Sequence, residues 1–248
     1  MTSAARQVQG SAEVIPLERG DARRSPLETV LRFATEPARR ASGQPTVDVW
    51  GRDGRLVSRF APIAHLRWDI SVGGEQHLPA GPALVVVNTR RFALTPLTTA
   101  MALGDALDRP VRFAGRPDTA PVGSLLRRLG GILAAPSEIA SALRGGDIVV
   151  VAAAPTIDPR RVGRVDESLI VAAVREHAPI HIAATLSSAI GRDARVEVAP
   201  ALVPRHARRG PLAEIEIAEQ AQRDLHALLD ELGGTRIGVP GLGWIGVG

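Results

Sequence analysis

Strands and helices are predicted to alternate along most of the chain. Short apolar runs predict strands, and longer segments with apolar residues at helical spacing predict helices. The predicted strands are residues 83–88, 111–114, 131–134, 147–153, 180–186 and 195–199. The predicted helices are residues 96–107, 122–129, 137–144, 166–177 and 212–232. This alternation is typical of a mostly parallel sheet covered by helices, so we predict an α/β fold.

The segment before this alternation predicts a helix and a hairpin. Ser25 can cap a helix that starts at Pro26, and apolar residues follow at helical spacing. Farther along, Asp53-Gly54 lies between two short alternating runs, which predicts a hairpin. A further alternating run covers residues 68–72.

The two ends of the chain differ from its middle. Residues 1–24 mix small, polar and charged types without periodicity, which predicts a mobile tail. The last 14 residues alternate Gly with Ile, Val, Leu and Trp, so they cannot form a long helix. The predicted organisation is a tail at 1–24, a helix and hairpin at 25–66, one domain at 67–234, and a Gly-rich tail at 235–248.

Composition narrows the class of protein. The 248 residues are 45% hydrophobic and 23% charged, as in soluble globular proteins. Cys, Lys and Tyr are absent, so every basic side chain apart from His is Arg, and disulfide or thiolate chemistry is excluded. The amino-acid composition is rich in Ala, Arg, Gly and Val, which suggests a GC-rich bacterial genome. The net charge of +4 comes without a basic helix carrying aromatic residues, so we expect no nucleic-acid partner.

The distribution of apolar residues also bears on where in the cell the protein resides. No apolar run reaches the roughly 18 residues of a membrane-spanning helix, and the first residues show no apolar signal-peptide region. We therefore expect a cytoplasmic protein. Peripheral contact with the inner face of the plasma membrane stays open, because Arg32, Arg39 and Arg40 lie near the apolar face of the predicted helix at 25–42. The alternative is that this helix packs on the domain.

Candidate binding residues gather where predicted strands end. Ligand sites in parallel sheets lie at the carboxyl ends of strands, where helix N-termini and arginines also attract anions. The strand at 83–88 ends in Asn88, the only asparagine in the chain. The candidates for a phosphate or other ligand are Asn88, Thr89, Arg90, Arg91, Thr156, Arg160, Arg161 and Arg164. The alternative is that these arginines are only solvated.

Other chemistries lack their motifs. The chain has no Cys and no His-x-x-x-His, so we expect no metal. It also lacks a phosphate-loop lysine and a Gly-x-Ser-x-Gly nucleophile turn, and we expect no resident cofactor. Surface or structural roles are expected for the histidines His65, His77, His177, His181, His206 and His226.

The stretch from Val72 to Pro204 resembles the PlsC-like glycerophospholipid acyltransferases, which include the lysophosphatidic acid acyltransferases. The blocks that carry the resemblance are Gly74–Pro82, Ala83–Asn88, Arg112–Gly123, Leu129–Ile132, Leu143–Val150, Arg161–Gly163 and Pro179–Ala183. The resemblance implies a single domain of the PlsC-like acyltransferase fold. It also implies phospholipid metabolism, with acyl-CoA or acyl-ACP as the substrate.

The resemblance further implies that the reactive residues are missing. In that family the strand ends in Asn-His, and an Asp follows after four more residues. The His takes the proton of the acceptor hydroxyl and the Asp orients its ring. Here Thr89 stands at the His position and Leu94 at the Asp position. The family's Phe-Pro-Glu-Gly-Thr-Arg block, which seats the acceptor phosphate, resembles Val151–Thr156, where Thr156 is the one polar anchor.

These observations predict a degenerate, non-catalytic family member, a pseudoenzyme. It would bind a phospholipid or acyl ligand, or dock a protein partner through helix 212–232 and the C-terminal tail. The alternative is an atypical 1-acylglycerol-3-phosphate-type O-acyltransferase that acts on a lysophospholipid or a related hydroxyl acceptor.

Overall fold

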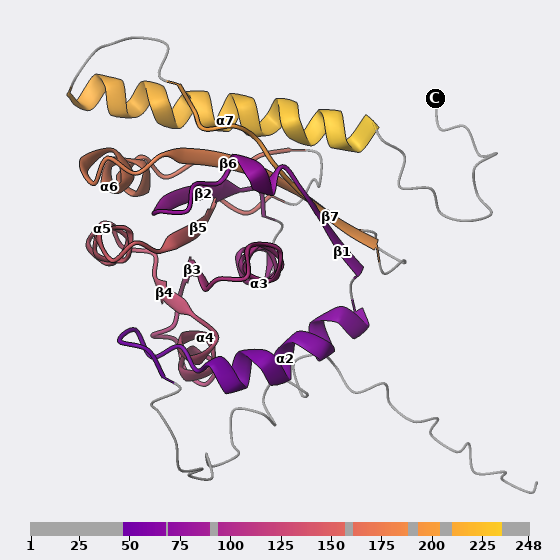
Figure 1. Cartoon of the computed structure of the whole chain (residues 1–248). Helices are drawn as coiled ribbons and strands as arrows, with labels where there is room; N and C mark the ends of the chain where they lie inside the picture. The colour runs from indigo at the N-terminus through magenta and orange to yellow at the C-terminus, as the bar shows by residue number, and fades with distance from the viewer. Residues whose placement is uncertain are drawn as a thin grey trace, which may run out of the picture. The chain divides into compact units, whose positions relative to one another are not determined.

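In the computed structural model, a seven-stranded sheet forms the centre of the part of the chain that the structure describes (Figure 1). The structure describes residues 47–67, 69–89, 94–156, 161–187, 193–203 and 210–234. All of them belong to one compact unit, residues 39–248. The predicted helix at 25–42 and both predicted tails lie outside the described residues.

The sheet is mostly parallel, as predicted, and its strand order is β1-β7-β6-β2-β5-β3-β4. The strands are β1 (Asp69–Gly73), β2 (Ala83–Val87), β3 (Val111–Gly115), β4 (Gly131–Leu133), β5 (Ile148–Ala152), β6 (Ile180–Ser187) and β7 (Asp193–Val198). β6, β2, β5, β3 and β4 run parallel to one another. β7 runs antiparallel to β6 and β1 parallel to β7, so these two strands have the opposite direction.

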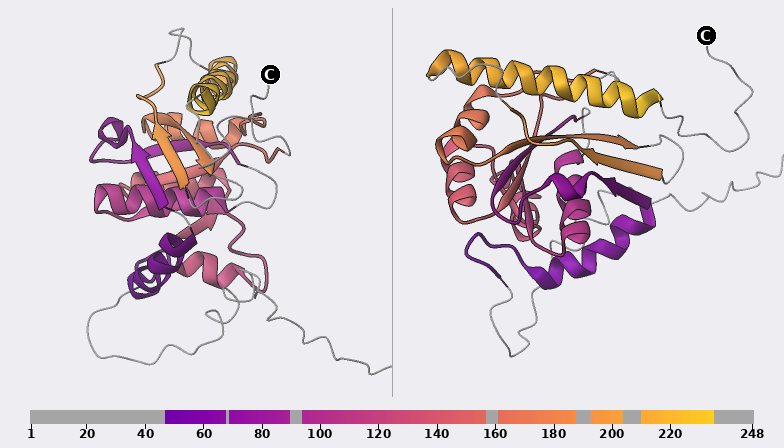
Figure 2. Two further views of the ribbon diagram at one scale, coloured as in Figure 1. Left: turned by 90° about the vertical axis from the view of Figure 1, so that its right-hand side faces the viewer. Right: turned by 45° about the horizontal axis from the view of Figure 1, so that its top comes forward.

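Helices cover both faces of the sheet (Figure 2). They are α2 (Gly54–Arg67), α3 (Thr95–Leu107), α4 (Gly123–Arg128), α5 (Pro136–Arg144), α6 (Glu167–Arg175) and α7 (Pro211–Gly234), with a 3-10 turn η1 (Glu75–His77). On one face α5 packs against α6 and α6 against α7, while α3 packs on β3 and β5 from the other face. Within the described ranges, no helix combines the length and the apolar character that crossing a bilayer requires.

The central strands are apolar because both of their faces are covered. All five residues of β2 are buried. Leu84 and Val86 share a core with residues of α5, α6 and α7. The alternate residues point to the other face, on the side of α3. Strands of this kind read as continuous apolar runs, which is why their positions were predictable.

The predicted strands and helices of the domain are confirmed, with ends that shift by no more than two residues. The predicted second strand of the hairpin at Asp53-Gly54 is wrong, because α2 begins at Gly54. Asp53 caps this helix: its Oδ1 accepts hydrogen bonds from the backbone N–H groups of Arg55 at 3.1 Å and Leu56 at 3.2 Å. One antiparallel bridge joins Val47 to Asp53, so the chain does turn there before the helix begins.

Candidate functional site

A cavity of about 840 Å³ opens at the carboxyl ends of four parallel strands. Thr89 follows β2, Arg116 follows β3, Ala134 follows β4, and Ala153–Pro155 follow β5. The first turn of α6 completes the wall. The place is the one predicted for an α/β sheet, and the volume lies within the range of about 300 to 1,000 Å³ that is usual for small-molecule sites.

The cavity wall is built mainly from small apolar side chains. Five of its residues are alanines, namely Ala114, Ala134, Ala152, Ala153 and Ala154. Pro96, Pro155 and Leu169 add further apolar surface. Side chains this small leave room between the strand ends and the start of α6, so the cavity suits an apolar group more than a compact ion.

Asn88 joins two strands and does not line the cavity. Its side-chain Nδ2 donates to the carbonyl of Thr185 at 2.9 Å, and its Oδ1 accepts from the N–H of Thr185 at 2.7 Å. The hydroxyl of Thr185 in turn lies 3.1 Å from that of Thr99 on α3, which is fully buried. The amide therefore extends the pairing of β2 with β6 beyond the last residue of β2, and its hydrogen-bonding groups serve the fold.

Thr89 lies at the cavity, and Thr156 holds the loop beside it. Thr89 is 9% exposed, and its carbonyl accepts a hydrogen bond from the N–H of Thr156 at 3.2 Å. The hydroxyl of Thr156 donates to the carbonyl of Arg161 at 3.0 Å. Thr156 thus fixes the loop that follows β5, and it is not part of the cavity wall.

Gly163 lets the segment after β5 return to the strand end. The N–H of Ala154 donates to the carbonyl of Arg164 at 2.8 Å. A Cβ at Gly163 would lie 1.9 Å from the carbonyl oxygen of Ala154, which only glycine avoids. This close approach places Arg164 in the cavity wall, whereas Arg161 faces a separate groove of about 630 Å³ beside Arg223 and His226 of α7.

Both arginines of the cavity wall pair with carboxylates. Arg164 pairs with Glu167 at 2.5 Å, and this hydrogen bond and the carboxylate charge raise the pKa of Arg164. Arg116 pairs with Asp118 at 3.4 Å. Two further groups of the wall, Asp166 and Ser168, bond to each other, with the hydroxyl of Ser168 donating to Asp166 at 2.7 Å.

Asp166 is also the N-cap of α6. Its Oδ1 accepts a hydrogen bond from the N–H of Ser168 at 2.9 Å. Asp166, Glu167 and Ser168 were not among the residues predicted for the site. The sequence does contain a signal for this helix start. Asp followed by Glu-Ser and by apolar residues at helical spacing is typical of the first turn of a helix.

The remaining predicted site residues lie in two settings. Arg90, Arg91 and Arg160 are outside the described residues. Leu94 is half-exposed and stands at the N-cap of α3, where no side chain caps the helix. Among the described candidates, therefore, Thr89 and Arg164 both line the cavity. Asn88, Thr156 and Arg161 lie outside its wall.

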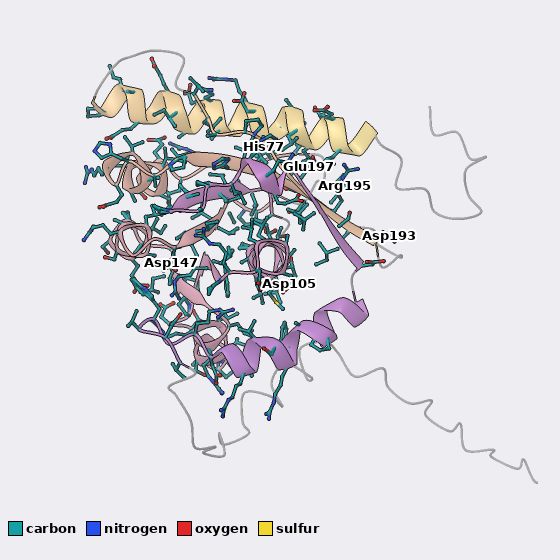
Figure 3. The ribbon with its side chains drawn as sticks, in the orientation of Figure 1. His77, Asp105, Asp147, Asp193, Arg195 and Glu197 are labelled. Carbon is teal, nitrogen blue, oxygen red and sulfur yellow. The ribbon has the colours of Figure 1, made fainter. Side chains whose placement is uncertain are left out.

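The described histidines lie away from the cavity wall. His77 belongs to η1, before β2, and η1 contacts β7 (Figure 3). His181 near the start of β6 is 1% exposed, and its Nδ1 lies 3.1 Å from the carbonyl of Ala199. Burial lowers the pKa of His181, and the charge of His77 lowers it further against that hydrogen bond. No histidine is found among the described residues that line the cavity.

The chemistry at the described wall is limited to hydroxyls, carboxylates and guanidinium groups. Thr89 and Ser168 supply the hydroxyls, and Asp166 and Glu167 supply the carboxylates. In the part of the chain that the structure describes, no three His, Asp or Glu side chains gather as a metal site requires. The described wall offers no imidazole to remove a proton near neutral pH.

No protein-family model and no curated protein sequence matches the chain. Its structure is similar to the crystal structure of the 1-acyl-sn-glycerophosphate (LPA) acyltransferase, PlsC, from Thermotoga maritima. The TM-score is 0.56 at 14% sequence identity, and the match covers 75% of this chain and 80% of that chain. At this identity the similarity concerns the fold, and it confirms the predicted PlsC-like acyltransferase fold.

Proposed function

We propose that this protein binds an acyl-chain ligand in the cavity at the strand ends and does not transfer the chain. The observation that carries the proposal is the cavity itself: about 840 Å³, lined by five alanines and by no described histidine. Binding of an acyl chain against an apolar wall is favourable, because it removes apolar surface of the chain and of the wall from water. Acyl transfer to a hydroxyl also needs a base, which the described wall lacks.

The resemblance to the acyltransferase family supports the loss of catalysis. Thr89 stands at the family's His position and Leu94 at its Asp position. A threonine hydroxyl does not ionise near neutral pH, so it cannot remove a proton from an acceptor alcohol. The leucine side chain can neither orient a base nor stabilise its charge.

Two measurements test the proposal. Purified protein is titrated with an acyl ligand by calorimetry, and it is separately mixed with acyl-CoA and lysophosphatidic acid while free thiol is followed. We expect binding without release of thiol. Ala134→Phe should weaken binding, because Ala134 is an exposed residue of the wall whose enlargement narrows the cavity without entering the core. Ala106→Phe, an exposed position of α3 outside the described cavities, is the matched control.

The second candidate is an atypical acyltransferase, and the carboxylates of Asp166 and Glu167 in the cavity wall favour it. A carboxylate can act as a general base when it is held within reach of the acceptor hydroxyl. Release of thiol that disappears in Thr89→Ala and in Glu167→Gln would establish this activity and refute the non-catalytic proposal.

Docking of a protein partner is the third candidate. The exposed side chains of Leu212 and Ile215 at the start of α7 favour it. Native mass spectrometry of the freshly purified protein separates the two binding hypotheses. A lipid bound at one per chain supports acyl binding, and a lipid-free chain with a stably bound protein supports docking.

A further inference from the structure

The formal charges of the described cavity wall cancel. Arg116 and Arg164 carry the positive charges, and Asp166 and Glu167 carry the negative charges. Each arginine has a carboxylate within 4.0 Å, since Arg116 pairs with Asp118 and Arg164 with Glu167. A phosphate that entered the cavity would compete with these carboxylates for the guanidinium groups, and it would meet two carboxylates of like charge.

The helix N-terminus in the wall is closed to anions as well. The first N–H groups of a helix normally form a favourable site for phosphate. In α6 the carboxylate of Asp166 already accepts from the N–H and the hydroxyl of Ser168, at 2.9 and 2.7 Å. Glu167 places a second negative charge in the same turn. The positive end of the helix is therefore neutralised by the protein's own side chains.

From these contacts we propose that Asp166 and Glu167 determine ligand specificity: the cavity takes an acyl chain with an uncharged head group and rejects one with a phosphate. The inference rests on the proposed acyl-binding function and adds the class of head group. The small apolar wall accommodates the chain, and the two carboxylates exclude the anion.

The test compares two ligands that share one acyl chain. Monolauroylglycerol has an uncharged head group, and lauroyl-lysophosphatidic acid carries a phosphate at the same end. Both are titrated into the full chain by calorimetry, below the concentration at which either forms micelles. We expect monolauroylglycerol to bind about tenfold more tightly or better. Equal or tighter binding of the lysophosphatidic acid overturns the inference and leaves acyl binding intact. If neither lipid binds, the proposed function fails and the inference fails with it.

The double variant Asp166→Asn, Glu167→Gln tests the assignment to these two residues. Asn retains the ability to cap α6, so the variant removes charge and keeps the fold of the helix start. We expect the ratio of lysophosphatidic acid affinity to monolauroylglycerol affinity to rise about fivefold over that of the wild type. Glu219→Gln removes a largely exposed carboxylate of α7 that pairs with Arg223, and it should change neither affinity. An unchanged lipid preference in the double variant contradicts the role of Asp166 and Glu167.

Discussion

Arg112 is a buried charge held by two carboxylates from distant parts of the chain. Its Nε lies 2.6 Å from Asp147, labelled in Figure 3, and its Nη2 lies 2.8 Å from Asp48. The ring of Trp50 lies 5.6 Å from the guanidinium carbon. Burial raises the pKa of Asp48, but hydrogen bonds from Arg52, Arg112 and Trp50 outweigh it and lower the pKa overall. The turn before α2 is thereby fixed to the amino ends of β3 and β5.

Arg112→Met should lower the free energy of unfolding by about 3 kcal/mol, because it leaves two partly buried carboxylates without their cation. Urea denaturation followed by circular dichroism measures the loss. Arg144→Met is the control, since Arg144 is largely exposed where it pairs with Glu176. It should cost less than about 1 kcal/mol. Equal losses of unfolding free energy in the two variants would show that the burial of Arg112 does not increase the stabilisation by its ion pairs.

His181 should make stability depend on pH. Its folded pKa lies below the ordinary 6.5, mainly because of burial. The unfolded chain then binds a proton that the folded chain does not, so stability falls as pH drops from about 6.5 through the lowered pKa. Above this window the contribution is constant. The carboxyl groups of Asp48 and Asp53, whose pKa values are lowered from 3.8, act only in stronger acid.

Unfolding free energies measured between about pH 5 and 7 check this expectation. The slope in the wild type should be absent in His181→Gln, whose amide can still donate to the carbonyl of Ala199. His226→Gln changes an exposed histidine of α7 and should keep the slope. A slope that survives in His181→Gln would assign the titration to another group.

Among the secondary-structure elements, the apolar pattern predicted the strands of the sheet and its helices. The prediction failed at Asp53-Gly54, where the same two residues are typical of both a hairpin turn and a helix start. Asp-Gly marks a hairpin turn, but Asp also caps helices. Leu56, Phe60 and Ile63 follow at helical spacing, and this longer signal was the correct one for α2. The directions of β1 and β7 depend on pairing between distant segments, which residue patterns do not encode.

The location of the cavity was predictable, while the contacts of each residue around it were not. Carboxyl ends of parallel strands indicated the cavity. Arg161 and Arg164 are close in sequence but face different cavities, because Gly163 packs against the end of β5 between them. The role of Asn88 is set by Thr185 on β6, a residue 97 positions away. Such contacts arise only from the folded chain.

Leu94→Asp should stabilise α3 without creating activity. The N-cap position of this helix has no side-chain hydrogen bond, and Asp there can accept from the backbone N–H of Leu97 in the first turn. We expect a gain of about 0.5 to 1 kcal/mol, measured by thermal unfolding, and no release of thiol from acyl-CoA. Leu94→Asn should give a similar gain, because Asn caps as well as Asp. Turnover in Leu94→Asp, or in Thr89→His with Leu94→Asp, would contradict the proposed loss of catalysis.

Gly163→Ala should disrupt the connection between β5 and α6. The added methyl group would overlap the carbonyl of Ala154, so the chain must move away from the strand end. We expect a loss of about 1 to 3 kcal/mol in unfolding free energy and weaker ligand binding, since Arg164 is positioned by the same contact. Gly81→Ala is the matched control, because a Cβ at Gly81 has no neighbour within 4 Å. A Gly163→Ala protein as stable as Gly81→Ala would contradict this account.

Across the whole described unit, the two ends of the parallel strands have different roles. At the amino ends, Arg109 donates to carbonyls of Pro79, Ala80, Gly81 and Gly146, and Arg112 holds its two carboxylates. These contacts fix the loops that enter β2 and β5. At the carboxyl ends, small side chains and paired charges surround an open cavity. The arginines at the amino ends therefore hold the loops of the sheet in place, and the proposed ligand binding lies at the carboxyl ends.

Native mass spectrometry can show in one experiment whether the chain holds an acyl lipid and leaves an acyl thioester intact. The protein is incubated with lauroyl-coenzyme A and monolauroylglycerol. The masses of the protein complex and of the small molecules are then measured. We expect one intact monolauroylglycerol per chain, an unbroken coenzyme A thioester, and less bound lipid on Ala134→Phe. Dilauroylglycerol with free coenzyme A, or a wild-type chain without lipid, would contradict this expectation.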